Sequence, residues 1–434
     1  MRALAASCLL GLPAVVVAAA CSSTSDATIA LTLGGEADAL TRAPAPTSLV
    51  VDVLALDGGA STLATVALPT DHADLGSLST DRNGSVRVIG KDGSGTVRVS
   101  GATLPVSFAA LAGGTLQVFV QRNGETARLP GTLTDAREAP FLAVASGQYL
   151  LVTGGTDTAQ ARTTSLYDLL GYKSFASPPT LPRAPGSFAL ASSYAMAIDA
   201  QGASFLNLGD DSTGDLTAPT GTSFSDVVGG ITVMGPDGTA YVVGPTRAGT
   251  ASAKVLSMDT AGALAFASLG TPRVGAGAAY VAGRGLVVFG GDAKAPAVEI
   301  LPAGATTTTV ASFPAQNVTG SAGAALDADR VLFAWATGNA GSFLTLDLAH
   351  PEPPPAPVAA TLPCAARHLD VLALDTKTAL IVAEDGPSCA FTWDGAVVTE
   401  VPLRIPRRGA RAIRLPTGGI AIVGGNATLE QFVP

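Results

Sequence analysis

Residues 149–155 read Tyr-Leu-Leu-Val-Thr-Gly-Gly, an apolar run that ends in two glycines. Similar runs, each ending in a small or turn-forming residue, recur at residues 194–199, 241–244, 286–291, 331–335, 380–383 and 420–425. When Gly154 is taken as the first end point, the later ones fall at about residues 199, 244, 290, 336, 383 and 424. The chain therefore repeats a unit of about 45 residues, which is typical of a repeat architecture.

The length of this unit predicts a β-propeller, because a four-stranded blade needs about 40–50 residues. The 50 Gly and 29 Pro among 434 residues disfavour helices. We therefore expect an all-β chain in which residues 125–434 form a seven-bladed propeller. Residues 125–133 match the outer strand that the last repeat lacks before the chain stops at Pro434. Pairing the two segments would close the ring and protect the last open edge.

Other features of the unit recur as well. The third strand ends in an apolar residue followed by Asp or Asn, as at Tyr167-Asp168, and an Arg follows a later Pro-containing turn. This turn is clearest at Leu181-Pro182-Arg183, Thr271-Pro272-Arg273 and Ile405-Pro406-Arg407. Together with the double Gly, these features resemble the kelch repeats of galactose-oxidase-type propellers. The resemblance implies a rigid scaffold that carries its loops on one face.

Residues 27–123 differ from the repeats. They contain short alternating runs at 27–33, 48–56, 62–68, 85–89, 96–100, 105–109 and 115–121, separated by turn signals such as Asn-Gly and Asp-Gly. Strands at this spacing predict a β-sandwich. The pattern looks like the immunoglobulin- or transthyretin-like modules that raise other bacterial domains above a membrane. This is an analogy between folds.

The first residues resemble a bacterial lipoprotein leader. Residues 1–20 combine a positive start, a short apolar run and small residues, which predicts a secretory signal peptide. Cys21 follows at once and would become the lipidated first residue, with residues 21–26 as a tether. We therefore expect a lipid-anchored protein of the bacterial cell envelope, at the outer membrane because Ser22 follows Cys21. The alternative is an ordinary signal peptide with a chance Cys.

Two of the four cysteines, Cys364 and Cys389, remain once Cys8 leaves with the signal peptide and Cys21 carries lipid. An exported protein with one such pair suggests one disulfide. We place Cys364 before a first strand and Cys389 after a second strand of the same repeat. Both would then lie on the same face of the propeller, as a bridge requires.

The recurring arginines suggest a binding face. In a propeller, the connections between blades and those between second and third strands emerge on one face. The candidate residues on that face are Arg137, Arg183, Arg273, Arg367, Arg407, Arg408 and Arg411. Guanidinium groups pair carboxylates or phosphates in a bidentate way, so such a ring could bind anions. Alternatively, each Arg packs on a neighbouring blade or caps a carbonyl group.

Composition excludes several functions. A net charge of −9 argues against nucleic acid, whose phosphates need a basic surface. Three His and two usable Cys offer little material for a metal site, and we expect no metal and no cofactor. We find no catalytic motif. We therefore expect a non-enzymatic protein that binds a protein or glycan partner. The alternatives are an enzyme acting on envelope or extracellular polysaccharide, and a structural envelope component.

Overall fold

The computed structural model describes residues 24–56, 59–79, 83–111, 114–244, 250–291, 298–311, 313, 318–352 and 355–434. Strands dominate these residues, and the helical elements there are the short 3-10 turns η1 (Phe108–Leu111) and η2 (Phe224–Val227). None of the helices in this described part is long and apolar enough to span a membrane. The predicted signal peptide and Cys21 lie outside the described residues. The all-β prediction is confirmed.

The N-terminal region contains two sheets that share one apolar core. In spatial order they are β4-β1-β8 and β3-β2-β5-β6-β9, with β7 paired to β5. Ile29 and Val118 of the first sheet pack with Leu49, Val51 and Val88 of the second. The strands are β1 (Thr24–Thr32), β2 (Ser48–Ala55), β3 (Ala60–Ala67), β4 (His72–Ser79), β5 (Asn83–Lys91), β6 (Val97–Ala102), β7 (Val106–Ser107), β8 (Thr115–Phe119) and β9 (Gln121–Arg122).

Two local expectations for this region were wrong. The strand β4 was not predicted, because its sequence mixes His, Asp, Gly and Ser with few apolar residues. The strand expected at residues 105–109 is the two-residue β7 followed by the turn η1. There Phe108 is buried in the core between the two sheets.

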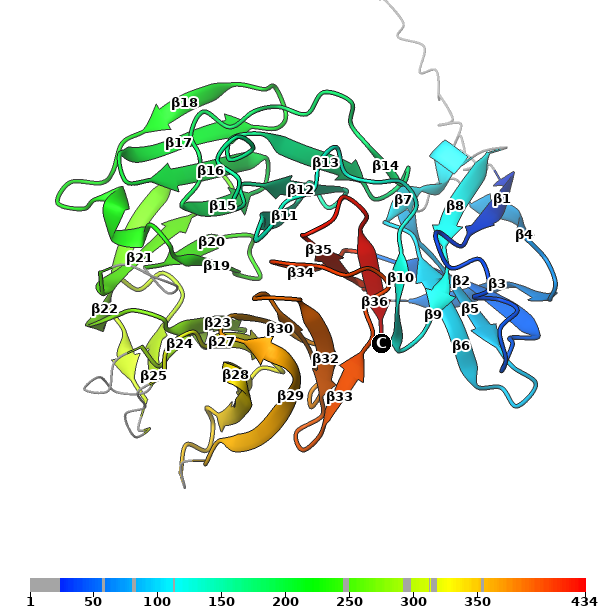
Figure 1. Ribbon diagram of the computed structural model, residues 1–434. Coiled ribbons are helices and arrows are strands. Elements are labelled where there is room, and N and C mark those ends of the chain that lie inside the picture. Colours follow the sequence, from blue (N-terminus) through cyan, green and yellow to red (C-terminus); the bar gives the residue numbers. More distant parts are fainter. Residues whose placement is uncertain are drawn as a thin grey trace, which may run out of the picture.

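From β10 (Glu125–Arg128) onward, the chain forms small antiparallel sheets arranged around a common centre, as Figure 1 shows. This arrangement is a β-propeller. The first sheets are β11 (Phe141–Ala145), β12 (Tyr149–Thr153), β13 (Thr164–Asp168) and β14 (Lys173–Ser174); β15 (Ser187–Ala191), β16 (Tyr194–Asp199), β17 (Gly202–Asn207) and β18 (Thr213–Leu216); and β19 (Ile231–Met234), β20 (Ala240–Val243), β21 (Ser252–Met258) and β22 (Leu264–Arg273).

The remaining sheets continue the circle in the same order. They are β23 (Gly277–Val281), β24 (Gly285–Phe289), β25 (Val298–Leu301) and β26 (Thr309–Val310); β27 (Ala322–Ala325), β28 (Arg330–Asp347) and β29 (Val358–Ala366); β30 (Leu369–Ala373), β31 (Ala379–Ala383), β32 (Cys389–Trp393) and β33 (Val398–Val401); and β34 (Arg411–Arg414), β35 (Ile420–Val423), β36 (Glu430–Val433) and β10. The first strand of each sheet is innermost.

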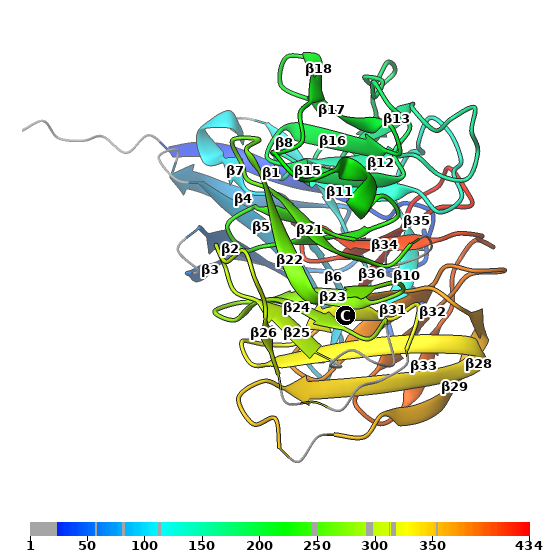
Figure 2. The ribbon, with the colours of Figure 1, turned by 90° about the vertical axis from the view of Figure 1, so that its left-hand side faces the viewer.

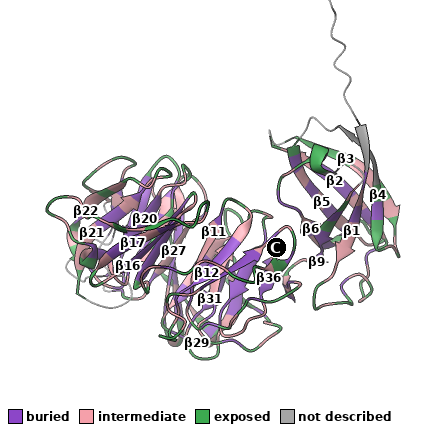
Figure 3. Ribbon diagram, turned by 90° about the horizontal axis from the view of Figure 1, so that it is seen from above, coloured by how far each residue is buried: buried purple, intermediate pink, exposed green. Residues whose placement is uncertain are grey.

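The apolar runs of the repeat are the second strands, and they are buried on both faces. All five residues of β24 and of β31 are buried. In contrast, buried and partly exposed residues alternate along β5, whose sheet covers a core on one side. Both faces of a propeller sheet pack against neighbouring sheets, so its second strand reads as a continuous apolar run. Figure 3 shows this concentration of buried residues in the ring.

Apolar clusters lie between successive sheets rather than in one central core. For example, Leu151 of β12 packs with Phe188 of β15, and Leu256 of β21 packs with Met196 of β16. The last sheet meets the first in the same way, because Val423 of β35 and Leu150 of β12 share a cluster. The packing therefore runs around the circle without a gap.

β28 is a hairpin rather than one straight strand. The amide of Leu348, just after β28, donates a hydrogen bond to the carbonyl of Asp329, just before it (2.8 Å). The chain turns back near Gly338, where φ is +60°. A straight strand of this length would extend about 60 Å at about 3.3 Å per residue, far beyond the other strands. The hairpin gives this sheet two middle strands between β27 and β29.

The ring closes between distant segments of the chain. β10 pairs antiparallel with β36, with Glu125 opposite Val433 and Arg128 opposite Glu430. This is the pairing expected of residues 125–133, but the strand ends at Arg128 before Pro130, which has no amide proton to donate. The Leu129 and Leu133 amides still donate to the carbonyls of Leu429 and Ala427. The C-terminus therefore lies beside the start of the ring (Figure 1).

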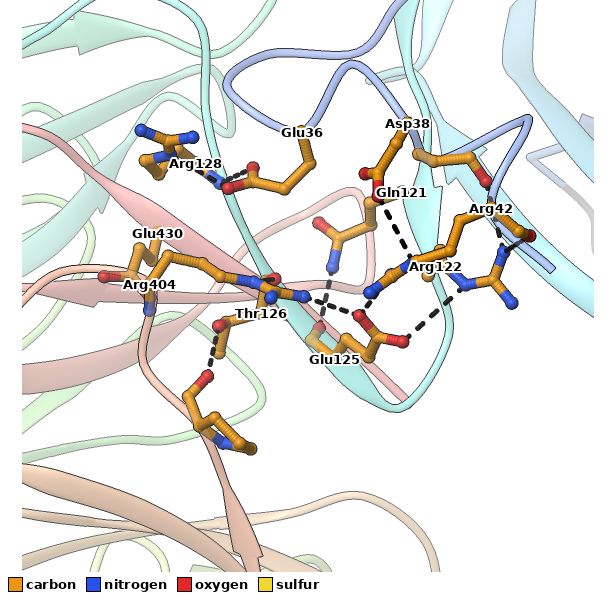
Figure 4. A network of polar contacts seen from close by, with 12 residues as sticks. Glu36, Asp38, Arg42, Gln121, Arg122, Glu125, Thr126, Arg128, Arg404 and Glu430 are labelled. Carbon is orange, nitrogen blue, oxygen red and sulfur yellow. Dashed lines mark hydrogen bonds and ion pairs between the residues drawn. The ribbon is translucent and has the colours of Figure 1, made fainter.

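A polar network joins the N-terminal region to this last sheet (Figure 4). The Glu125 carboxylate contacts Arg42 at 2.6 Å and Arg404 at 2.5 Å. Arg128 binds the Glu36 carboxylate through its backbone amide (2.6 Å) and its Nε atom (2.8 Å). These contacts connect the loop after β1, the strand β10 and the segment before β34. Figure 2 shows the N-terminal sheets lying alongside the ring from a second direction.

Candidate functional site

Three of the predicted face arginines, Arg137, Arg273 and Arg407, are buried, with relative exposures of 3%, 2% and 2%. Each donates from Nη1 to the carbonyl of the first glycine in a double-Gly pair. Arg137 donates to Gly154 at 3.1 Å, Arg407 donates to Gly424 at 2.9 Å, and Arg273 donates to Gly290. The predicted exposed arginine ring is therefore wrong for these three residues, and the alternative of carbonyl capping is what the structure shows.

Each buried arginine also has a carboxylate partner. Arg273 contacts Glu299 at 2.7 Å, and Arg407 contacts Glu430 at 3.1 Å; all four side chains are almost completely buried. Arg137 contacts Asp135 at 2.7 Å. A buried guanidinium needs such a partner, since an unpaired charge in the interior is strongly unfavourable. We call each set of Arg, carboxylate and double Gly a latch.

The carboxylates of the latches were not identified in the sequence. Glu299 lies in the third strand β25 and Glu430 in the third strand β36 of their sheets. Burial alone would raise the pKa of Glu299. Hydrogen bonds from Thr308, Arg273 and the Gly270 amide lower it below its usual value. For Glu299 the available signal was a lone Glu within an otherwise apolar strand.

The double glycines serve the latch through their backbone. Gly154, Gly290 and Gly424 have φ values of +65°, +78° and +123°. The second glycine of each pair also has a positive φ. Such conformations are strained for residues with a Cβ atom. At Gly425 a Cβ would lie 2.3 Å from the Arg408 amide nitrogen. The sequence motif therefore fixes the connection that leads out of the second strand.

The other predicted face arginines are accessible to different extents. Arg408 is exposed and lies 3.7 Å from Glu138, and Arg367 is also exposed. Arg183 is partly exposed and contacts Asp199 at 3.3 Å and Asp215 at 3.0 Å. All three lie in connections between successive sheets, at the same ends of the inner strands. They are the accessible members of the predicted face, although two carboxylates already pair with Arg183.

The inner strands surround a central cavity of about 580 Å³. Residues from β11, β15, β19, β23, β27, β30 and β34 line it. Its ionisable lining residues lie on or next to two neighbouring inner strands. Asp370 belongs to β30 and His368 precedes it, and Arg411 and Arg414 begin and end β34. The remaining wall is mostly apolar and includes Leu142, Val144, Val233 and Met234. The cavity therefore has one charged side and one apolar side.

Arg411 lies at one end of this charged side. Its Nε atom contacts Asp370 at 2.8 Å and Glu384 at 3.2 Å. Burial opposes the charge, but these two carboxylates raise the pKa of Arg411 above its usual value. Two carboxylates therefore already occupy the guanidinium of this predicted face residue. The sequence analysis did not identify Asp370 or Glu384.

A second polar pair lies next to this cluster. The His368 ring contacts Asp385 at 3.0 Å, and the other Asp385 oxygen accepts hydrogen bonds from the Arg367 and His368 amides, each at 2.7 Å. Burial would raise the pKa of Asp385, but these hydrogen bonds lower it. Within the described segments, no group of three or more His, Cys, Asp or Glu is arranged to hold a metal ion.

The predicted disulfide between Cys364 and Cys389 is present, with the two Cα atoms 6.1 Å apart. Its placement differs from the expectation. Cys364 lies within β29, the outer strand of one sheet, and Cys389 begins β32 of the next sheet. The bond therefore connects two neighbouring sheets of the ring, rather than two loops of one repeat.

Comparison with known proteins gives structural likenesses only. No family model and no curated protein matches the sequence. The structure titled "YCF48 bound to D1 peptide" is 11% identical, with a TM-score of 0.44, and the match covers 71% of this chain and 95% of that chain. "COPII on membranes, outer coat vertex" is 12% identical, with a TM-score of 0.47 and coverages of 70% and 84%. The computationally designed Ika8 protein is 12% identical, with a TM-score of 0.42 and coverages of 71% and 100%.

Proposed function

We propose that this protein is a non-enzymatic lipoprotein of the bacterial cell envelope whose propeller binds a protein or glycan partner. One observation carries the proposal. The connections between sheets are held by buried latches, while Arg183, Arg367 and Arg408 remain accessible on that same face. Rigidly supported loops with accessible polar groups are where binding sites usually lie. Guanidinium groups there suit carboxylates of a protein or an acidic glycan.

In this proposal the propeller has seven kelch-like blades, and the N-terminal sheets form an immunoglobulin- or transthyretin-like sandwich. The repeated contact between an arginine and the first glycine of a pair supports the kelch-like assignment. The hairpin of β28 supports a fourth strand in its blade. The domain boundaries are then residues 27–123 for the sandwich and 125–434 for the propeller. The contacts of Glu125 with Arg42 and Arg404 would hold the two domains in a fixed relation.

The location in the cell envelope rests on the sequence. Residues 1–20 would be the signal peptide and Cys21 the lipidated residue, at the outer membrane. Metabolic labelling with a fatty acid tests this directly. We expect label on the wild-type chain and none on a Cys21→Ala variant. Labelling of both chains, or of neither, contradicts the lipid anchor.

The enzyme alternative needs two accessible carboxylates in one pocket. Asp370 and Glu384 are the nearest arrangement, but both contact the Arg411 guanidinium. Glu384 is also buried, with a relative exposure of 4%. This engagement favours binding over polysaccharide cleavage. A purely structural role would require assembly of the protein into arrays, which electron microscopy of purified envelopes would reveal.

A pull-down from detergent-solubilised membranes tests the binding face. The test variant carries Arg183→Ala, Arg367→Ala and Arg408→Ala. The control carries Arg87→Ala, Arg98→Ala and Arg284→Ala, which removes the same charge from partly exposed positions outside that face. We expect the wild type and the control to retain the same partner and the test variant to lose it. Equal capture by all three chains contradicts the proposal.

A further inference from the structure

The end of the cavity opposite Arg411 contains a cation without a carboxylate partner among the described residues. Arg414 ends the inner strand β34 and lines the cavity. Its guanidinium donates to the carbonyls of Ala373 and Gly418 (3.4 Å for the latter). Arg414 is exposed, and burial of part of its side chain lowers its pKa. Among the described residues, its hydrogen bonds go to backbone carbonyls rather than to a carboxylate. This distinguishes Arg414 from Arg137, Arg273, Arg407 and Arg411, each of which contacts a carboxylate.

The carboxylate of an acidic turn at this end of the inner strands is already hydrogen-bonded. Asp375, which follows β30, accepts hydrogen bonds from the amides of Lys377 at 2.7 Å and Thr378 at 2.8 Å. These bonds hold its carboxylate within its own turn. Arg414 therefore keeps unused donor capacity, because a guanidinium carries five N–H donors.

Apolar lining residues lie at the same end of the inner strands as this cation. Val144 lies next to the end of β11, Met234 ends β19 and Leu372 lies next to the end of β30, and all three line the cavity. Val144 and Leu372 are half-buried and also pack against the apolar clusters between neighbouring sheets. Met234 has a relative exposure of 48%, which is high for a large apolar side chain that belongs to a strand. A cavity of about 580 Å³ is within the usual size range of small-molecule sites. Such sites are mostly apolar and contain a few oriented polar groups.

We propose that the propeller channel binds a small amphiphile whose carboxylate head pairs with Arg414 and whose apolar body lies against Val144, Met234 and Leu372. The carboxylate accepts two hydrogen bonds from the guanidinium, and the apolar body leaves water. This site lies at the opposite end of the inner strands from Arg183, Arg367 and Arg408. It is therefore independent of the proposed partner-binding face.

The test is isothermal titration of the purified full-length chain with sodium decanoate at concentrations below micelle formation. Arg414→Gln keeps much of the side-chain volume and removes the charge. We expect Arg414→Gln to weaken decanoate binding at least about tenfold, because the carboxylate loses its hydrogen bonds to a charged group. Arg284→Gln is the matched control: it lies in the turn after β23, outside the cavity lining. This variant should bind within about twofold of wild type.

Two further measurements separate charge from shape. Arg414→Lys should retain most of the affinity because it keeps the positive charge, and decyltrimethylammonium should not compete with decanoate. Circular dichroism must show that each variant unfolds at the same temperature as wild type. The absence of decanoate binding to wild type contradicts the proposal. Equal affinity in Arg414→Gln, or stronger binding of the cationic amphiphile, also contradicts it.

Discussion

The guanidinium of Arg407 lies 3.1 Å from the carboxylate of Glu430, and both side chains are completely buried. Arg407 precedes the first strand of its sheet, and Glu430 begins the third. Their contact therefore fixes the path by which the chain enters the last sheet. Arg273 and Glu299 repeat the arrangement elsewhere in the ring, at 2.7 Å.

Loss of one latch partner should destabilise the protein strongly. Arg407→Ala leaves Glu430 buried without its ion-pair partner, and breaking such a pair costs about 3–5 kcal/mol. Urea denaturation followed by circular dichroism measures the effect. Arg408→Ala is the control, because this neighbour is exposed, and we expect a change within about 0.5 kcal/mol. Equal stability of the two variants would falsify the structural role of the latch.

The latch should also make the protein sensitive to acid. The pKa of Glu299 is lower in the folded state than its usual value of 4.5. Its stabilising contribution is therefore complete above about pH 4.5 and is lost as the pH falls through the folded pKa. We expect wild type to lose more stability between pH 6 and pH 3 than Glu299→Gln does. Urea midpoints across this range provide the measurement.

Glu400→Gln is the matched control for that experiment, since Glu400 is exposed on β33. The control should show the same acid dependence as wild type. If the stability of Glu299→Gln falls with pH as steeply as that of wild type, the Glu299 carboxylate contributes nothing to acid sensitivity.

The second glycine of a pair should not tolerate a Cβ atom. Gly425 has φ +69°, and a Cβ there would lie 2.3 Å from the Arg408 nitrogen; Gly418 has φ +90° but no atom within 4 Å of a Cβ. Both Ala variants carry the backbone strain, which costs about 1–3 kcal/mol. We expect the free energy of unfolding of Gly425→Ala to be about 2 kcal/mol lower than that of Gly418→Ala. The difference arises because only the Gly425 variant forces the nearby backbone to move. Thermal unfolding of the two variants compares them, and equal melting temperatures would argue against the close approach.

Removal of the disulfide should lower stability. The bond closes a loop with a sequence separation of 25 residues. The chain-entropy model gives about 3 kcal/mol for a loop of this size. We expect a Cys364→Ser/Cys389→Ser variant to unfold at lower urea concentration than wild type under oxidising conditions. Under reducing conditions the two proteins should converge, and a difference that persists there would point to lost packing instead.

The repeat could be predicted because its signal is local and recurs. The second strands are buried on both faces, so each is a continuous apolar run that the sequence displays directly. The closing pair could be predicted because the last repeat lacks an outer strand and residues 125–133 supply one. The disulfide could be predicted because two cysteines were assigned to the predicted signal peptide and lipid anchor, which left one pair.

The polar partners could not be predicted because they depend on contacts between distant residues. Nothing near Arg273 in the sequence indicates that Glu299 is its partner, and Arg411 reaches Asp370 on the neighbouring inner strand. The sequence therefore left two interpretations open for these arginines, a binding face or capping of carbonyl groups, and three of them prove to be buried caps. β4 was missed because its sequence lacks the alternation of apolar and polar residues that predicts a strand.

Closure of the ring by β10 and β36 is the claim on which the rest depends. Ala127 and Gln431 lie opposite each other in this pair. A chain with Ala127→Cys and Gln431→Cys should form a disulfide within one molecule, because directly opposed strand residues lie at bridging distance. Peptide mapping by mass spectrometry identifies the bond. Ala127→Cys with Phe432→Cys is the control, since a shift of one residue points the side chain to the other face. We predict a disulfide within one molecule for the Ala127→Cys/Gln431→Cys chain and none for the control. If the Ala127→Cys/Gln431→Cys chain forms disulfides only between molecules, or forms none, the closed ring is contradicted.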